Sequence, residues 1–402
     1  MALDIGGGRI SVARLMLTDF RNIAGLRIEA GGQCIVLTGK NGAGKSNLLE
    51  SVSLLAPGKG LRNAASHELT RHGAGGGWSV AATLVGRDRM IAVGTGAHAD
   101  PSARAGGRAV RIDGVDEKSS SALDCVAAVL WLTPAMDGLF LGPAAERRRF
   151  LDRLAAGCAP SHRTQVSRFE LAMRHRNRLL ETGAPARTLA AYERQMAEHA
   201  VAVAAARVDA VERLRHVIEA RRAAGSAFPS ADVRIEGELE RDVAERPAVD
   251  VEDAYADALR EGRERDRAAR RALVGPHASD LAVWFAPKAM PAKLCSTGEQ
   301  KALLIGLILA QADLVKQARA GEAPILLFDE VAAHLDQGRR EALFNEIFRL
   351  DSQAWLTGTH RRDFQALEGR AQFLHVADGA VNADEAHGLS REDVVVKRMR
   401  AK

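Results

Sequence analysis

A glycine-rich segment with an embedded lysine carries the clearest chemistry in the sequence. Residues 39–46 read GKNGAGKS and match the pattern G-x-x-x-x-G-K-[ST], in which backbone amides surround phosphate groups. The apolar residues 34–37 predict a strand before this segment, and a helix is expected over about residues 45–55. Lys45 would place a positive charge on the phosphates, and Ser46 would offer a hydroxyl to Mg²⁺. We therefore expect a nucleotide site that comprises Gly39, Lys40, Asn41, Gly42, Ala43, Gly44, Lys45, Ser46 and Asn47.

Two carboxylates follow a second apolar run. Residues 325–328 read ILLF, which predicts a buried strand, and Asp329 and Glu330 come next. A parallel strand that ended here would bring Asp329 to Mg²⁺ beside the phosphate loop. Because side chains alternate along a strand, Glu330 would project elsewhere and polarise the attacking water. The predicted catalytic residues are Lys45 and Glu330, and the predicted magnesium ligands are Ser46 and Asp329.

A third segment combines a hydroxyl, a glycine and the start of a helix. Residues 294–301 read LCSTGEQK and precede a long apolar run, and the spacing of Ser296 and Glu299 predicts a capping box. Taken alone, this segment is only a helix start. A helix N-terminus nevertheless presents free amides at a positive dipole end, and together with the serine it would receive a terminal phosphate. The residues of this candidate site are Ser296, Gly298, Glu299 and Gln300.

These segments lie at the two ends of a chain whose middle has a different character. Residues 9–38 and 76–115 show the alternation of strands, and the pattern returns after residues 275–276, including a strand at 354–357. Residues 146–222 instead have helical spacing, with breaks near 183–185 and again near 225–229. The simplest account is one α/β domain split by a helical insertion. The first part of this α/β domain, with the phosphate loop, is predicted at residues 1–145, and the helical, arginine-rich lobe at residues 146–270. The second part of the α/β domain, with the helix-start segment and the acidic strand end, is predicted at residues 271–402.

Charge is distributed unevenly along the chain. The whole sequence has 56 Lys and Arg against 51 Asp and Glu, a net charge of +5 that names no partner by itself. Residues 146–222 carry 16 arginines against nine acidic residues, whereas residues 231–270 carry 13 acidic residues against eight arginines. An arginine run is by default a solvated helix face. The densest such run is Arg147, Arg148 and Arg149.

The spacing of the cysteines and the hydropathy of the chain bear on its metal sites, its disulfides and its cellular location. The four cysteines, Cys34, Cys125, Cys158 and Cys295, are scattered without the spacing of a zinc site or a disulfide framework. The longest strongly apolar run, residues 302–310, is far shorter than the ~18 residues that a membrane span needs. We expect a cytoplasmic protein with no membrane partner.

Together, the phosphate loop, the acidic strand end and the helix-start segment resemble the ABC-type ATPases. This resemblance implies an α/β ABC-type head, a mixed sheet with antiparallel strands plus a parallel core, into which the α-helical lobe is inserted. It also implies ATP and Mg²⁺ as ligands and an ATP-dependent homodimer, in which Ser296 and Gly298 of one subunit close over the ATP of the other. No residue is assigned to the Mg²⁺-sensing glutamine of transporter-type ATPases, because residues 34–164 contain no glutamine.

The spacing between the motifs and the local sequence indicate one family within that class. The 251 positions that separate Lys45 from Ser296 are more than a compact transporter ATPase would have between these two motifs. They are too few for the long antiparallel coiled coils of chromosome-structural and double-strand-break ATPases. The chain resembles the RecF family of bacterial recombination mediators. The matching segments are residues 20–22 (FRN), 139–153 (LFLGPAAERRRFLDR), 273–277 (LVGPH), Asp280 and Leu281, and 296–311 (STGEQKALLIGLILAQ). The resemblance implies a weak DNA-stimulated ATPase that, with RecR and RecO, promotes RecA loading at gaps during DNA repair and replication restart.

Five further positions match residues of related heads. Arg21 and Asn22 belong to the FRN segment, and Arg62 resembles an arginine that related heads bring to ATP or DNA. His360 matches the switch histidine of ABC proteins, and Asp336 is expected to meet a partner subunit.

The mode of DNA binding follows from the aromatic content. With 11 Phe, four Trp and two Tyr, the chain is poor in the rings that single-strand binders stack on bases. For the DNA binding that the resemblance implies, we therefore expect backbone contacts to duplex DNA at gaps or junctions, with Arg147, Arg148 and Arg149 as the candidate residues. Two alternatives remain open at this point: the ATPase subunit of a transport or energy-coupling machine, and a nuclease-associated ATPase.

Overall fold

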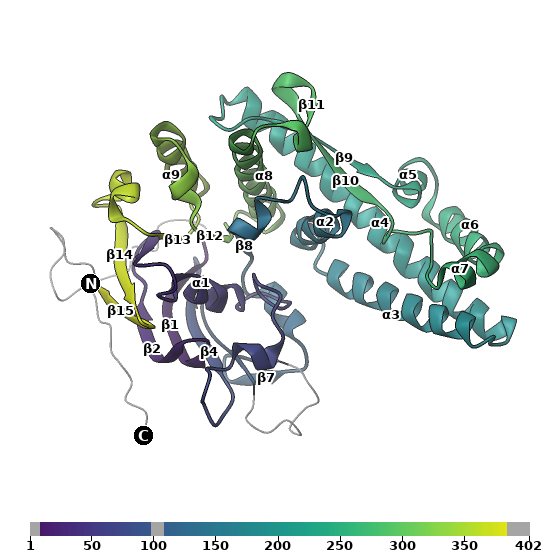
Figure 1. Ribbon diagram of the computed structural model, residues 1–402, viewed down its shortest axis with the longest axis horizontal. Helices are drawn as coiled ribbons and strands as arrows, with labels where there is room; N and C mark the ends of the chain where they lie inside the picture. The colour runs from purple at the N-terminus through teal and green to yellow at the C-terminus, as the bar shows by residue number, and fades with distance from the viewer. Residues whose placement is uncertain (1–8, 98–107, 384–402) are drawn as a thin grey trace. The chain divides into compact units, whose positions relative to one another are not determined.

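The computed structural model describes residues 9–97 and 108–383, which form two compact units (Figure 1). The first unit contains the described residues up to Met136 and those from Val315 onward, and the second contains Asp137–Leu314. The second unit is longer than the helical part expected at residues 146–270. The reason is a strand pairing: β9 (Ala231–Glu236), which the sequence reading placed in a helical segment, is hydrogen-bonded to β10 (Asp280–Phe285).

An antiparallel sheet supplies half of the first unit. Its strands follow the order β2-β1-β4-β5-β6-β7. They are β1 (Ser11–Phe20), β2 (Ile23–Glu29), β4 (Ser79–Val85), β5 (Met90–Gly96), β6 (Ala109–Ile112) and β7 (Val115–Glu117). In β4 and β5 every second residue is buried, as expected for strands with one face on a core.

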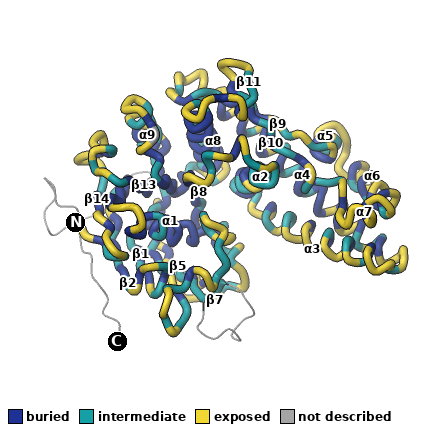
Figure 2. Tube along the Cα trace, viewed as in Figure 1, coloured by how far each residue is buried: buried dark blue, intermediate teal, exposed yellow. Residues whose placement is uncertain are grey.

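A second sheet contains the strands that precede the phosphate loop and the acidic strand end. Its order is β15-β14-β3-β13-β12-β8, with β14 through β8 parallel and β15 antiparallel at the edge. The strands are β3 (Cys34–Thr38), β8 (Val129–Leu132), β12 (Ile325–Phe328), β13 (Ala354–Gly358), β14 (Ala371–Ala377) and β15 (Ala380–Ala383). β3, β12 and β13 are buried along their whole length (Figure 2), which explains their continuous apolar sequence. Because these strands are parallel, their carboxyl ends share one edge of the sheet.

Short helices complete the first unit. The longer ones are α1 (Lys45–Ser53), which follows the phosphate loop, and α9 (Gln337–Leu350). The 3-10 helices are η1 (Ser66–Leu69), η2 (Ser120–Cys125), η3 (Pro134–Met136), η6 (Val331–His334) and η7 (Arg361–Leu367). One apolar core joins both sheets to α1, whose Leu48, Leu49 and Val52 are fully buried in it. This packing fixes the direction in which α1 leaves the phosphate loop.

Helices dominate the second unit. They are α2 (Ala144–Cys158), α3 (His162–Glu181), α4 (Ala186–Ala223), α5 (Glu238–Glu245), α6 (Ala248–Glu261), α7 (Arg263–Ala269) and α8 (Thr297–Ala318), whose last turn enters the first unit. A small sheet has the order β11-β10-β9, with β11 at Met290–Pro291, and η4 (Ala286–Lys288) and η5 (Ala292–Leu294) flank it. The expected helix breaks near residues 183–185 and 225–229 coincide with the ends of α3 and α4.

Candidate active site

The phosphate loop needs glycine at its turns. Gly39, Gly42 and Gly44 have φ of 145°, 82° and 109°, a region that side chains disfavour. A Cβ atom at Gly39 would lie 2.2 Å from the carbonyl oxygen of Val376, so any larger residue would displace β14. The loop therefore has the open, amide-rich backbone that the motif predicts.

Lys45 is buried under this loop. Its ammonium donates hydrogen bonds to the carbonyl oxygens of Gly39 (2.7 Å) and Lys40 (3.0 Å). Burial lowers the pKa of Lys45, while the negative charges of Glu330 and Asp329 act in the opposite direction. The ammonium thus lies beside both the loop and the acidic strand end, where it would contact a bound phosphate.

Ser46 and Asp329 meet as the sequence predicts. The Ser46 hydroxyl donates to Asp329 Oδ1 at 2.9 Å, although 283 positions separate the two residues. A second hydroxyl, that of Thr357 at the end of β13, donates to the same oxygen at 2.7 Å. Hydroxyl and carboxylate oxygens are ligands that suit Mg²⁺, so this pair fits the expected metal.

Glu330 has a strained backbone. Its φ of 53° lies in the left-handed region, which costs a non-glycine residue roughly 1–2 kcal/mol. Its amide donates to Thr357 Oγ1 at 2.9 Å, and the neighbouring amide of Asp329 donates to the carbonyl oxygen of Leu132 at 2.9 Å. Neighbouring strands therefore hold the turn in which Glu330 lies, and residues 133–136 follow β8 at the same edge of the sheet.

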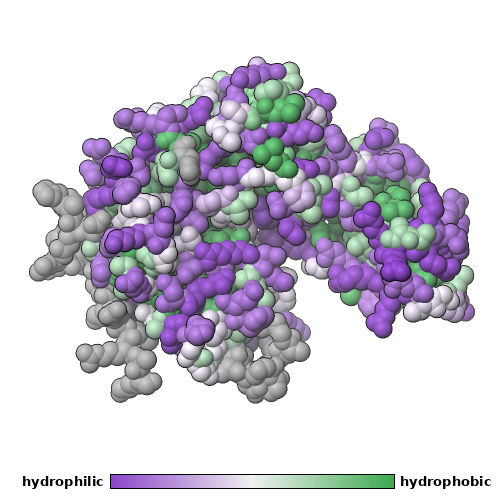
Figure 3. All heavy atoms as spheres, viewed as in Figure 1, coloured by the Kyte–Doolittle hydropathy of each residue, from purple (hydrophilic) through white to green (hydrophobic). Residues whose placement is uncertain are grey.

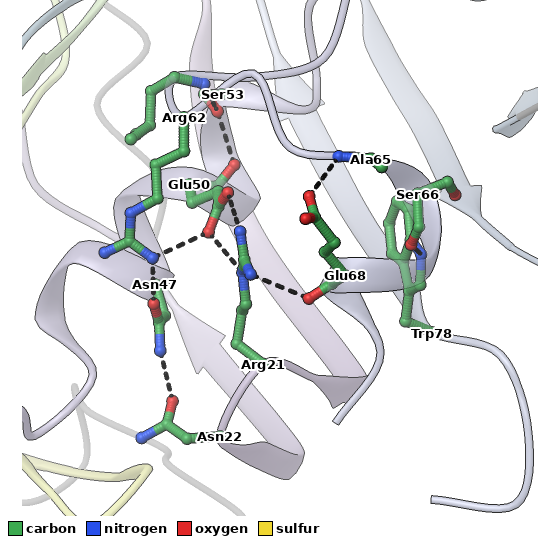
Figure 4. Close-up of polar contacts among 11 residues, drawn as sticks. Arg21, Asn22, Asn47, Glu50, Ser53, Arg62, Ala65, Ser66, Glu68 and Trp78 are labelled. Atoms are coloured by element: carbon green, nitrogen blue, oxygen red, sulfur yellow. Dashed lines mark hydrogen bonds and ion pairs between the residues drawn. The ribbon is translucent and has the colours of Figure 1, made fainter. Parts of the chain in front are cut away.

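A buried carboxylate lies on α1, the helix that follows the phosphate loop (Figure 4). Glu50 of α1 is fully buried and accepts two hydrogen bonds from Arg21, at 2.7 and 2.9 Å. Arg62 also donates to it, at 3.2 Å, and donates to Asn47 Oδ1 at 2.6 Å. Arg21 further donates to the carbonyl oxygen of Glu68, so the cluster ties the β1–β2 turn, α1 and residues 62–68 together.

Two asparagines connect this cluster to the phosphate loop. Asn47 Nδ2 donates to Asn22 Oδ1 at 2.8 Å (Figure 4). Asn22 Nδ2 donates to the carbonyl oxygen of Ala43 at 3.4 Å. Because each amide donates in one direction and accepts in the other, Arg62 fixes the orientation of Asn47, which in turn fixes that of Asn22. The structure thus groups Arg21, Asn22 and Arg62 beside Asn47.

The predicted capping box is present in the second unit. Glu299 Oε2 accepts from the Ser296 amide and hydroxyl, both at 2.9 Å, and the Glu299 amide donates to Ser296 Oγ at 3.4 Å. Lys288 pairs with the other carboxylate oxygen. These contacts, Lys288 first, lower the pKa of Glu299 to about 2.

The two other residues of that segment differ in exposure. Gly298 is exposed and has open space where a Cβ atom would lie. Gln300 is buried and donates to the carbonyl oxygen of Cys295 at 3.0 Å. Gln300 therefore stabilises the turn before α8, and the backbone of Gly298 is exposed to solvent.

Two further candidates, His360 and Asp336, follow strands of the parallel sheet. His360 is exposed and follows β13 by two positions, and Thr359 Oγ1 lies 3.5 Å from Asn41 Oδ1 of the phosphate loop. Asp336 caps α9, since its carboxylate accepts from the Arg339 amide at 2.9 Å. That cap gives Asp336 a local role that the sequence reading did not foresee.

The three consecutive arginines of α2 differ in their hydrogen-bond partners and exposure. Arg147 donates to both carboxylate oxygens of Asp280, at 2.8 and 2.7 Å, and Arg148 donates to the carbonyl oxygen of Ser279. Arg149 is exposed. Two of the three candidate arginines therefore already have partners within the second unit, whereas Arg149 is exposed to solvent.

The sequence reading missed two buried polar residues. Glu50 lies in the helix expected over about residues 45–55, and Thr357 lies in the strand expected at 354–357, but neither was predicted as a site residue. The available signals were a charged residue next to two leucines, at positions 48 and 49, and a hydroxyl near the end of a buried strand. Neither signal names a partner, because Arg21, Arg62 and Asp329 are distant in sequence.

Curated relatives agree closely with the chain. A DNA replication and repair protein RecF from Mesorhizobium japonicum is 50% identical over 375 residues, covering 93% of this chain and 98% of that protein. A protein of the same name from Rhizobium rhizogenes is 51% identical over 374 residues, with 93% and 98% coverage. The chain belongs to the RecF family. A scan against protein-family models found no match.

Solved structures show the fold. The recombination mediator protein RecF of the RecFOR pathway, solved in its ATPrS form, is 18% identical, covers 95% of this chain and 100% of its own, and has a TM-score of 0.81. An Smc head bound to the C-winged helix domain of ScpA, 16% identical, covers 96% of this chain and 97% of its own, with a TM-score of 0.53. The expected ABC-type ATPase head with an inserted lobe is confirmed.

The two segments most specific to the RecF family meet in the second unit. Arg207 of α4 is buried and donates to both carboxylate oxygens of Asp152, from the LFLGPAAERRRFLDR segment, at 2.9 and 3.1 Å. It also donates to the carbonyl oxygen of Pro276, from the LVGPH segment, at 2.6 Å and to Glu240 at 3.1 Å. In this RecF-family chain the two segments therefore build one charged core.

Proposed function

We propose that the chain binds ATP with Mg²⁺ at the phosphate loop and hydrolyses it. The observation that carries this proposal is the contact of Ser46 with Asp329, which joins the phosphate loop to the acidic strand end. Lys45 would bind the β- and γ-phosphates, and Ser46 and Asp329 would hold the metal. Bound Mg²⁺ would neutralise charge that develops on the phosphate oxygens.

Glu330 is assigned the role of orienting and deprotonating the attacking water. It directly follows the metal-ligand candidate and is half-buried, so that water can reach its carboxylate. The γ-phosphate would leave as inorganic phosphate, and the strained turn at Glu330 suits a residue whose position must be fixed.

ATP binding is proposed to bring two copies of the chain together. Ser296, Gly298, Glu299 and Gln300 of one copy would close over the ATP of the other, because Ser296 and Gly298 are exposed at the start of α8, where the helix dipole favours a negatively charged phosphate. Hydrolysis removes the phosphate that both copies hold, so the dimer would open.

The closed dimer is proposed to bind DNA at gaps and junctions through the phosphate backbone. Arg149 is the best-placed of the three candidate arginines because its side chain is exposed. The relatives are named as DNA replication and repair proteins, and one solved relative as a recombination mediator of the RecFOR pathway. On this basis we assign to the chain RecA loading with RecR and RecO, and a cytoplasmic setting.

The transport alternative gains no support from the chain. The RecF relatives match it over 93% of its length.

In the described ranges 9–97 and 108–383, no helix is long and apolar enough to cross a membrane. Hydrophilic residues predominate on the face drawn in Figure 3.

A binding titration with gapped, duplex and single-stranded DNA, each with and without ATP, tests the proposal. We expect ATP to strengthen binding to gapped and duplex DNA, and Lys45→Ala to abolish that gain. Binding should weaken steeply with salt, because phosphate contacts release counterions. Equal, salt-insensitive binding to single strands with or without ATP contradicts the proposal.

A further inference from the structure

Thr357 connects the two carboxylates of the acidic strand end. It is fully buried in β13, and its hydroxyl donates to Asp329 Oδ1 at 2.7 Å while accepting the amide of Glu330 at 2.9 Å. Strand register makes this contact possible: Leu356 lies opposite Phe328, so the next residue of β13 reaches the turn that follows β12. One hydroxyl therefore contacts both the metal-ligand candidate and the backbone of the water-activating candidate.

The contact decides which oxygen of Asp329 is free. Oδ1 accepts from the hydroxyls of both Ser46 and Thr357, which uses its two lone pairs. Oδ2 receives no hydrogen bond from the described residues, so this oxygen is left for a metal ion or a metal-bound water. Without Thr357, rotation about the Asp329 side chain would exchange the two oxygens.

The same hydroxyl supports the turn at Glu330. That residue has φ of 53°, and a left-handed residue that is not glycine persists only where its surroundings hold it. Thr357 Oγ1 is the acceptor for its amide, so the position of the Glu330 backbone depends on the position of this hydroxyl.

We propose that Thr357 is a positioning residue of the ATPase site, which directs Asp329 Oδ2 toward Mg²⁺ and holds the backbone of Glu330. The inference rests on the proposed function. The alternative hypothesis is that Thr357 has only a structural role, in which its hydroxyl donates to whichever acceptor lies nearby. The two differ in what the loss of the hydroxyl changes: metal dependence in the first case, and only stability in the second.

Thr357→Val removes the hydroxyl and keeps the shape, and Thr357→Ser keeps the hydroxyl. The readout is equilibrium binding of a fluorescent, non-hydrolysable ATP analogue with and without Mg²⁺. We expect Thr357→Val to raise the Mg²⁺ concentration needed for half-maximal binding by roughly 10- to 100-fold, the range for residues that orient metal ligands. Metal-free binding should be unchanged, and Thr357→Ser should restore the wild-type response.

Thr95→Val is the matched control, because Thr95 is also a buried strand threonine and its hydroxyl donates to the carbonyl oxygen of Ala109, far from the site in sequence. If Thr357→Val responds to Mg²⁺ as Thr95→Val and wild type do, Thr357 has no positioning role. Thr357→Ala serves the same comparison if the valine variant does not fold. If wild-type protein and Lys45→Ala bind the analogue equally, the proposed function itself is wrong.

Discussion

Glu50 is fully buried and lies between two arginines from separate segments of the chain, Arg21 and Arg62. Arg21 forms a two-point contact with the carboxylate, and this hydrogen bonding raises the pKa of Arg21. Arg62 is the looser partner, with 40% of its side chain exposed. The carboxylate therefore fixes the β1–β2 turn to α1 and leaves Arg62 partly available.

We expect Glu50→Gln to lower the free energy of unfolding by about 1–3 kcal/mol, the cost of weakening a buried hydrogen-bonded charge. Denaturant unfolding of Glu50→Gln and of wild type provides the measurement. Arg62→Ala should cost less, within about 1 kcal/mol, because an exposed ion pair contributes little. Equal stability of Glu50→Gln and wild type would show that the carboxylate does not hold the cluster.

Arg207 provides a test of the second unit. Replacing it with methionine leaves Asp152 and Glu240 without their shared guanidinium, and breaking a buried pair typically costs about 3–5 kcal/mol. Chemical denaturation should show this loss. Arg149→Ala, on the exposed face of α2, should stay within about 0.5 kcal/mol of wild type. A stable Arg207→Met protein contradicts the charged core.

Arg149 and Arg147 should separate DNA contact from folding. Arg149→Ala is expected to weaken ATP-dependent DNA binding equally across sequences and to reduce the salt slope by about one unit, without loss of stability. Arg147→Ala should instead lower stability, because Arg147 is paired with Asp280. Salt-dependent binding by fluorescence anisotropy distinguishes them. An unchanged slope for Arg149→Ala removes that residue from the DNA surface.

The start of α8 should be insensitive to mild acid. Its neighbours lower the pKa of Glu299 to about 2, against an ordinary value of 4.5, so the stabilisation from this carboxylate is complete above pH 4.5 and is lost as the pH falls toward 2. Carboxyl ¹³C NMR of glutamate-labelled protein, assigned with Glu299→Gln, should show Glu299 still ionised at pH 4. Titration together with ordinary glutamates contradicts the contacts of Lys288 and Ser296.

Local pattern was sufficient for the parts of the site that follow one another in sequence. The apolar run 325–328 is β12 itself, and the strand expected at 354–357 is β13 extended by Gly358. The capping box of Ser296 and Glu299 was predictable because its members are three residues apart.

Long-range partners were not predictable. Glu50, Thr357 and Arg207 acquire their roles from residues that are distant in sequence and are brought together by sheet register and helix packing. The helical reading of residues 231–236 failed for the same reason, since β9 is stabilised by hydrogen bonds to β10. Arg147 shows the converse error: a local charge run suggested a solvated surface, and a distant aspartate pairs with it.

The central claim is a nucleotide switch, in which ATP closes two copies of the chain and hydrolysis at Glu330 opens them. Sedimentation velocity of Glu330→Gln with ATP and Mg²⁺ tests it most directly. We expect a long-lived dimer for this variant, whereas wild type should return to monomer as ATP is consumed. A Glu330→Gln protein that stays monomeric, or whose dimer lasts no longer than that of wild type, contradicts the switch.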